Sequence, residues 1–168
     1  VFEGRDLGHP LIPGDRRVVN DVAVGPSGTL LLITGSNMSG KSTLLRAIGL
    51  NTVLAQAGAP VCASSLRLPP VDLETSMRVQ DSLEHGLSYF MAGLARLKGV
   101  VDRAQREATA GNGRTLMYLL DEILQGTNTA ERSIAVRGIA RRLLNAGAIG
   151  VMTTHDLGQA RRLAPEIE

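Results

Sequence analysis

The feature that most constrains the fold is a glycine-rich segment, Gly35-Ser-Asn-Met-Ser-Gly-Lys-Ser42, which fits the pattern G-x-x-x-x-G-K-[ST] in full. Glycines let backbone N–H groups curl around a phosphate, and a helix that follows directly adds the positive end of its dipole. An apolar run precedes the segment at 29–34, and a helical pattern follows from Lys41 to about Gln56. This context predicts a phosphate-binding loop rather than an ordinary glycine turn before a helix.

Two side chains of this loop have predicted chemical roles. Lys41 is expected to reach the β- and γ-phosphates, and the Ser42 hydroxyl is expected to bind Mg²⁺. The implied ligands are therefore ATP and Mg²⁺. The predicted nucleotide-binding residues of the loop are Gly35, Ser36, Asn37, Met38, Ser39, Gly40, Lys41, Ser42 and Thr43.

Short apolar runs alternate with helical patterns along the chain, which favours an α/β fold. Expected strands cover 29–34, 61–68, 115–120 and 148–153, and expected helices cover 41–56, 88–110, 128–145 and 157–164. The run at 29–34 lacks alternation, as expected of a strand buried on both faces. Residues 1–20 are expected to be irregular because prolines and a glycine interrupt them, and 71–87 show no clear pattern.

The helix expected at 128–145 has the clearest local signals. Asn128 and Glu131 fit an N-cap with a capping box, and Gly147 fits the end of the helix. The side chains predicted to form its buried stripe are Ile134, Ile139, Leu143 and Leu144.

The apolar strand at 115–120 runs directly into two acids, Asp121 and Glu122. On its own such a pair is often only a strand entering a loop. With a phosphate loop upstream, Asp121 is predicted to join the Mg²⁺ shell. Glu122 is predicted to act as a general base on the water that attacks the γ-phosphate.

His155 follows the strand at 148–153. A lone histidine at a strand end is commonly structural or solvated. The carboxyl ends of parallel strands face the ligand crevice, however, so His155 is also a candidate to sense or polarise the γ-phosphate and the attacking water. The predicted catalytic residues are Lys41, Glu122 and His155.

Composition narrows the remaining classes. A chain of 168 residues with 43% apolar and 20% charged residues indicates one globular domain. No stretch approaches 18 consecutive apolar residues, and the only cysteine is Cys62, so no membrane span is expected and a reducing cytoplasm is the expected compartment. The net charge of +2 does not by itself indicate nucleic-acid binding.

Together these residues resemble the MutS family. The segment T-G-S-N-M-S-G-K-S-T at 34–43 resembles that family's T-G-P-N-M-x-G-K-S-T, and the Asn-Met pair is more specific than the general loop pattern. The segments at 86–92 and 121–129 resemble G-x-S-x-F-x-x-E and D-E-[IL]-x-x-G-T-[SN]-T. Thr154-His155 is similar to the T-H switch of the MutS family, and the His9-Pro10 pair resembles an H-P pair that the family has ahead of its ATPase core. The resemblance runs from about Leu7 to Leu163.

The resemblance implies a P-loop NTPase fold with an ABC-ATPase-like sheet and flanking helices, in which 1–168 form one MutS-type ATPase domain from the C-terminal part of a longer protein. It implies a head-to-tail homodimer in which Ser88 binds, in trans, the γ-phosphate held by the other subunit. Residues 126–128 would lie across the same interface. Without the resemblance, Ser88 is only a helix N-cap. Any DNA contact is expected from domains outside these residues.

Several positions depart from the family pattern. Gly-Thr-Asn-Thr-Ala-Glu-Arg132 stands where mismatch-repair members commonly have G-T-S-T-Y-D-G, Ser36 replaces a usual proline, and Gly93 replaces a usual acid. These departures indicate a divergent branch and put mismatch repair itself in doubt. Residues 18–20 are candidates to line an adenine pocket, as the equivalent segment does in the family.

Two other functions remain to be weighed. The first is a nucleotide-dependent dimerisation module with little turnover. The second, an ABC transporter ATPase, is disfavoured because an L-S-G-G-Q-type loop is missing before Asp121.

Overall fold

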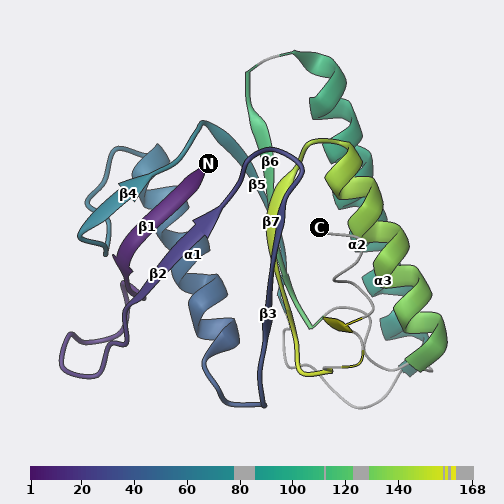
Figure 1. The fold of residues 1–168 in the computed structure, drawn as a ribbon, viewed down its shortest axis with the longest axis horizontal. Helices are drawn as coiled ribbons and strands as arrows, with labels where there is room; N and C mark the ends of the chain where they lie inside the picture. Colours follow the sequence, from purple (N-terminus) through teal and green to yellow (C-terminus); the bar gives the residue numbers. More distant parts are fainter. Residues whose placement is uncertain (78–85, 112, 123–128, 157, 159, 162–168) are drawn as a thin grey trace.

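The fold is known from a computed structural model that describes residues 1–77, 86–111, 113–122, 129–156, 158, 160 and 161. Within these residues, seven strands form two sheets and three helices flank them (Figure 1). The predicted mixed α/β architecture is therefore confirmed.

The central sheet is parallel, with the strand order β3-β7-β6-β5. Its strands are β3 (Leu30–Thr34), β5 (Val71–Ser76), β6 (Thr115–Asp121) and β7 (Ile149–Thr154). In β6 every residue after Thr115 is buried, and all of β7 is buried, as their apolar sequences require. The prediction of burial on both faces was wrong for β3, which lies at the sheet edge and is only partly buried.

A smaller antiparallel sheet holds strands β2 (Asn20–Val24), β1 (Phe2–Leu7) and β4 (Ser65–Arg67), in that order. The prediction that residues 1–20 are irregular was wrong for β1. Its register shifts between Gly4 and Leu7, and Asp6 has φ 48°, so a bulge breaks the alternation that would have marked the strand. The strand expected at 61–68 is shortened to β4, and the unassigned 71–87 segment contains β5.

The three helices lie on opposite faces of the parallel sheet. Helix α1 (Lys41–Gln56) packs on one face together with the antiparallel sheet, and α2 (Gly86–Ala110) and α3 (Thr129–Asn145) cover the other face (Figure 1). Each face has its own apolar core, one with α1 and one with α2 and α3. In the described residues, no helix combines the length and apolar character that a membrane crossing needs.

The buried face of α3 differs from the predicted stripe. Leu143 is fully buried and Ile139 is partly buried, but the prediction for Ile134 was wrong because its side chain is 66% exposed. The buried positions are instead Ser133, Val136, Ala140 and Leu143. These positions face the apolar core that α3 shares with α2, whereas Ile134 faces away from it. Asn128 of the predicted capping box lies outside the described residues, so the capping box stays a prediction.

Tyr118 on β6 and Gly150 on β7 are complementary in shape. Their Cα positions pair in the parallel ladder, and a Cβ built on Gly150 would lie 2.2 Å from the Tyr118 ring. The Tyr118 side chain is fully buried, and its burial raises the pKa of its hydroxyl. Gly150 is therefore required to leave room for the ring.

We predict that Gly150→Ala destabilises the fold by about 1–3 kcal/mol or more, because the added methyl group overlaps an aromatic ring that cannot move aside in a packed core. Urea unfolding followed by circular dichroism measures the change. Gly138→Ala is the matched control, since a Cβ there has nothing within 4 Å and lies in α3. It should stabilise the protein by about 0.5–1 kcal/mol. Equal stability of Gly150→Ala and the parent chain would contradict the prediction.

Candidate nucleotide site

The candidate site lies at the edge of the parallel sheet where β3, β6 and β7 end. Because these strands are parallel, their carboxyl ends meet at one edge, at the bottom of Figure 1. The loop from β3 into α1 crosses the same edge. The phosphate loop, residues 35–42, is thereby placed beside the residues that follow β6 and β7.

The phosphate loop is shaped by backbone conformations that favour glycine. Gly40 has φ 88° and forms the N-cap of α1, accepting the first helical hydrogen bond from Leu44 N at 2.9 Å. Met38 also has a positive φ, 64°, and its side chain is fully exposed. The first turn of α1 carries no acidic residue, so the amides at this helix end face no competing carboxylate from their own turn.

Lys41 is held inside the phosphate loop. Its Nζ donates hydrogen bonds to Gly35 O at 2.9 Å and Ser36 O at 2.7 Å, and its side chain is buried. A buried ammonium group needs such acceptors, because an unpaired charge is strongly disfavoured away from water. The hydrogen bonds fix the only lysine charge of the loop at its centre.

Asp121 and Glu122 are tied to β7 through Thr153. Asp121 pairs with Thr153 in the ladder, and Thr153 Oγ1 donates to Asp121 Oδ1 at 2.5 Å. Glu122 N donates to both Thr153 O and Thr153 Oγ1 at 3.2 Å. The buried hydroxyl thus orients both acids, a role that the sequence analysis missed although Thr153 precedes the recognised Thr154-His155 pair.

Glu122 lies between two basic groups. Its Oε1 is 3.8 Å from Lys41 Nζ and 3.1 Å from His155 Nδ1. Its backbone has φ 45°, a strained conformation for a residue with a side chain, and such strain concentrates at functional sites. The structure therefore brings the three predicted catalytic residues together. His155 reaches the site through Glu122, so direct contact with a phosphate stays a prediction.

A cavity of about 570 Å³ lies between the phosphate loop and the two acids, and we call it the acid-side cavity. Its lining residues are Asn37, Met38, Ser39, Gly40, Lys41, Ser42, Thr43, Arg46, Asp121 and Glu122. Arg46, an exposed residue of α1, was not singled out in the sequence and adds a second positive charge. A hollow with backbone amides, two cations and two carboxylates fits a phosphate chain with a metal ion.

The oxygen atoms of Ser42 and Asp121 fit the predicted Mg²⁺ site. Hydroxyl and carboxylate oxygens are the ligand types that Mg²⁺ takes, and Mg²⁺ at phosphate sites is held by one or two protein groups together with substrate oxygens and waters. In the described part of the chain, no group of three or more His, Cys, Asp or Glu residues could hold a metal ion by itself.

A second cavity, of about 630 Å³, lies on the other side of the phosphate loop and also borders Lys41, and we call it the N-terminal cavity. Among its lining residues are Val18 and Asn20, the ends of the segment predicted to line an adenine pocket. His9, Ile12 and Arg16 line it as well. In the sequence, His9 is recognisable only as part of the His9-Pro10 pair of the family resemblance, because no spacing links the first 20 residues to the phosphate loop.

A buried asparagine joins this N-terminal segment to α1. Asn51 Nδ2 donates to Gly8 O at 3.0 Å and to Ala47 O at 2.8 Å, and Asn51 Oδ1 accepts from Cys62 N at 2.6 Å. Its side chain is fully buried. One amide thus satisfies backbone groups from two separate loops.

The roles predicted for Ser88 and for residues 126–128 stay predictions. Ser88 is the third residue of α2, so it does not precede the helix as an N-cap would, and its side chain is outside the description. Residues 126–128 lie outside the described residues.

The chain matches the family model of MutS domain V over residues 31–166. The chain belongs to the MutS family. This match covers the phosphate loop, the two acids and His155, so the predicted family is confirmed.

Curated relatives extend the likeness over most of the chain. Endonuclease MutS2 of Thermomicrobium roseum is 34% identical over 150 residues, and that of Thermus thermophilus is 35% identical over 148, each covering 88% of this chain. The DNA mismatch repair protein MutS of Fusobacterium nucleatum is 31% identical over 161 residues, 92% of this chain. The MutS-family chain spans only 17–18% of the length of these relatives.

Solved structures show the same fold at much lower identity. A putative ABC transporter ATP-binding protein from Pyrococcus furiosus has a TM-score of 0.51 at 13% identity and covers 92% of this chain and 91% of its own. An ATP-binding subunit of an ABC transporter has a TM-score of 0.52 at 14% identity, and the match covers 97% of this chain and 82% of that subunit. The predicted ABC-ATPase-like fold is confirmed, and this fold with the MutS family supports a nucleotide-binding role.

We predict that Thr153→Val lowers the free energy of unfolding of this MutS-family chain by about 1–3 kcal/mol, because the Asp121 carboxylate loses a buried donor. Thermal and urea unfolding measure the change. Thr153→Ser is the control, since it retains the hydroxyl, and it should lose less. If valine and serine variants were equally stable, the hydroxyl would have no role in holding the acids.

Proposed function

We propose that this chain binds ATP with Mg²⁺ and hydrolyses it to ADP and phosphate. The observation that carries the proposal is that one cavity is lined by the phosphate loop, Lys41, Ser42, Asp121 and Glu122. The MutS family and the ABC-ATPase fold supply the nucleotide-binding framework.

In the proposed binding step, the loop amides and Lys41 hold the phosphates, while Ser42 and Asp121 would hold the metal ion. Mg²⁺ bound there would supply neutralisation of charge on the β- and γ-phosphate oxygens. Lys41 Nζ can exchange its bonds to Gly35 O and Ser36 O for phosphate oxygens with only a small movement, because it already lies within the loop.

In the proposed hydrolytic step, a Glu122 carboxylate oxygen accepts a proton from the attacking water. The water oxygen bonds to the γ-phosphorus, the bond to the β–γ bridging oxygen breaks, and ADP leaves with that electron pair. His155 Nδ1 lies 3.1 Å from Glu122 Oε1, which limits the orientations open to the carboxylate. Thr153 holds the Glu122 backbone from the other side.

We further propose that 1–168 act as one ATPase domain that closes as a head-to-tail homodimer, with Ser88 of each subunit completing the other's site. The first turn of a helix offers amides and a hydroxyl to an anion, which suits this role. Closure would be coupled to DNA through protein regions other than these residues, as expected if the chain functions like the MutS proteins it resembles.

We predict that Lys41→Ala and Glu122→Gln separate binding from turnover. Lys41→Ala should weaken ATP binding at least about tenfold, because a buried charge on the phosphates is lost. Glu122→Gln should bind ATP normally but lower kcat about 10²- to 10⁴-fold, because an amide cannot accept the proton. Isothermal calorimetry and phosphate release measure the two effects. Parent-level hydrolysis by Glu122→Gln would refute the assigned base.

We predict that two inactive variants restore activity when mixed. Ser88→Ala leaves a chain with an intact phosphate loop, and Lys41→Ala leaves a chain with an intact Ser88. If sites are completed in trans, one site of the mixed dimer is whole. Phosphate release from the mixture should exceed the sum of the rates of the two variants alone. As a control, Ser88→Ala mixed with a chain that carries both Ser88→Ala and Lys41→Ala should show no such increase.

Light scattering with and without ATP distinguishes the alternative function. ATP-dependent dimers without phosphate release would favour a nucleotide-dependent dimerisation module over an ATPase. An activity per chain that is independent of protein concentration, with no gain on mixing, would contradict completion of the site in trans.

A further inference from the structure

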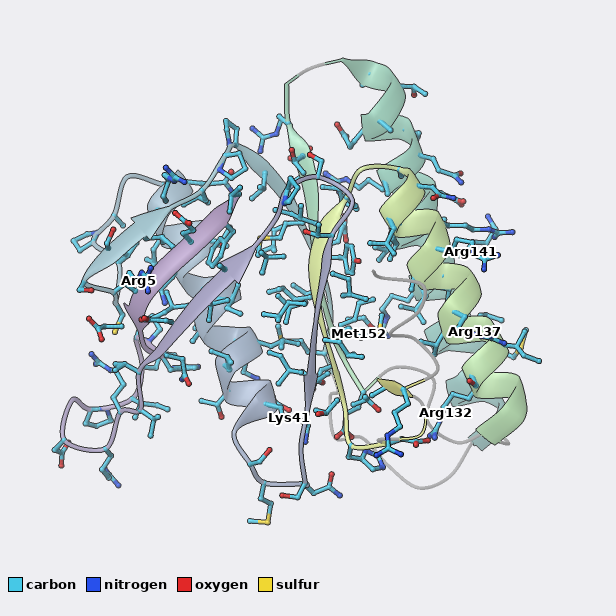
Figure 2. All side chains as sticks on the ribbon, viewed as in Figure 1. Arg5, Lys41, Arg132, Arg137, Arg141 and Met152 are labelled. Carbon is cyan, nitrogen blue, oxygen red and sulfur yellow. The ribbon has the colours of Figure 1, made fainter. Side chains whose placement is uncertain are left out.

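An ion pair joins the start of α3 to the segment that carries His155. Arg132 Nη2 lies 2.7 Å from Asp156 Oδ2, and the two side chains are only 15% and 22% exposed. In Figure 2, Arg132 lies at the end of α3 nearest Lys41, whereas Arg137 and Arg141 project outward farther along the helix. The pair is therefore at the site edge and shielded from water, unlike a typical surface salt bridge.

The pair also fixes the local path of the backbone after β7. Asp156 N donates to Thr154 Oγ1 at 3.1 Å, and Asp156 O accepts from Ala160 N at 3.0 Å. With the carboxylate held by Arg132, Asp156 is restrained through its backbone and its side chain. His155 is the neighbouring residue, so its direction toward Glu122 depends on these restraints.

The connection leads to Glu122 through His155. His155 Nδ1 lies 3.1 Å from Glu122 Oε1. Arg132, at the other end of the connection, lies in the first turn of α3. The ion pair thus holds Asp156, and through it the neighbouring His155, to α3.

The guanidinium of Arg132 is mostly buried and is paired with Asp156. Arg132 Nε is buried and, among the described residues, has no hydrogen-bond partner. Burying this guanidinium is unfavourable without a carboxylate beside it, so the bond to Asp156 holds the arginine in place.

We propose that Arg132 and Asp156 are positioning residues that hold His155 against Glu122 for ATP hydrolysis. The proposal rests on the proposed function for its kinetic consequence. Neither residue lines the acid-side cavity, so the pair acts on the orientation of the base and not on nucleotide binding.

Arg132→Ala and Asp156→Asn, alone and combined, test the proposal in this chain. Each single variant should lower kcat about 10- to 100-fold while the Kd for ATP stays within about twofold, since only alignment of the base is lost. The double variant should be no slower than the slower single variant, because both changes break one connection. Arg132→Lys should retain part of the activity. Arg137→Ala is the matched control, an exposed arginine of the same helix, and should match the parent chain.

Nitrogen-15 spectra of labelled histidine give a readout that does not need turnover. A contact from Nδ1 to a carboxylate requires the proton on Nδ1, so the parent chain should show the Nδ1–H tautomer for His155. Of the three histidines, the His155 signals are those lost in His155→Gln. In Arg132→Ala and Asp156→Asn the signals should shift toward the Nε2–H tautomer of free imidazole.

The two readouts separate failure of this inference from failure of the proposed function. If the parent chain does not hydrolyse ATP but the tautomer changes as expected, the ATPase proposal fails and the positioning role stands. If the parent hydrolyses ATP while both variants retain its kcat and its tautomer, the positioning role is wrong. Losses that add in the double variant, or an equal loss in Arg137→Ala, would also overturn it.

Discussion

The site depends first on the parallel ladder between β6 and β7. Its register places Asp121 opposite Thr153, and from that pairing follow the hydrogen bonds of Thr153 to both acids. His155 follows Thr153 by two residues, and its Nδ1 lies 3.1 Å from Glu122 Oε1. Successive strand residues point to opposite faces, so a shift of one residue would turn the Thr153 side chain away from Asp121. Nearly all of both strands is buried, and the packing on both faces locks this register.

The same sheet also places the phosphate loop. Thr34, the last residue of β3, pairs with Thr154 on β7, so the loop leaves the sheet beside the His155 segment. Lys41 and Glu122 are far apart in sequence, yet Nζ and Oε1 come within 3.8 Å. The chemistry of the site therefore rests on sheet geometry more than on any one loop. The Tyr118 ring lies over Gly150 and adds a side-chain contact between β6 and β7.

The sequence predicted those parts of the site that are continuous in the chain, namely the phosphate loop, the acids after β6 and the histidine after β7. It did not predict β5, because the strand-like alternation of Val71-Asp-Leu-Glu74 is only four residues long and is followed by polar Thr75 and Ser76. In the structure, both acids form ion pairs with arginines. Arg114 Nε lies 2.9 Å from Asp72 Oδ1, and Arg103 Nη1 lies 2.6 Å from Glu74 Oε1. Charges neutralised by distant arginines cannot be recognised from a window of neighbouring residues. The ion pair of Arg132 with Asp156 could not be predicted for the same reason.

The N-terminal cavity and the acid-side cavity both border α1. Asn51 joins α1 to Gly8 and Cys62, so the wall formed by the N-terminal segment is attached to α1. The N-terminus of α1 is also the end of the phosphate loop. A ligand that touched both cavities would therefore contact two groups anchored on the same rigid element, and α1 packs against the sheet that positions Asp121 and Glu122. The position of α1 relative to β6 therefore sets the separation of Lys41 Nζ from Glu122 Oε1, which is 3.8 Å.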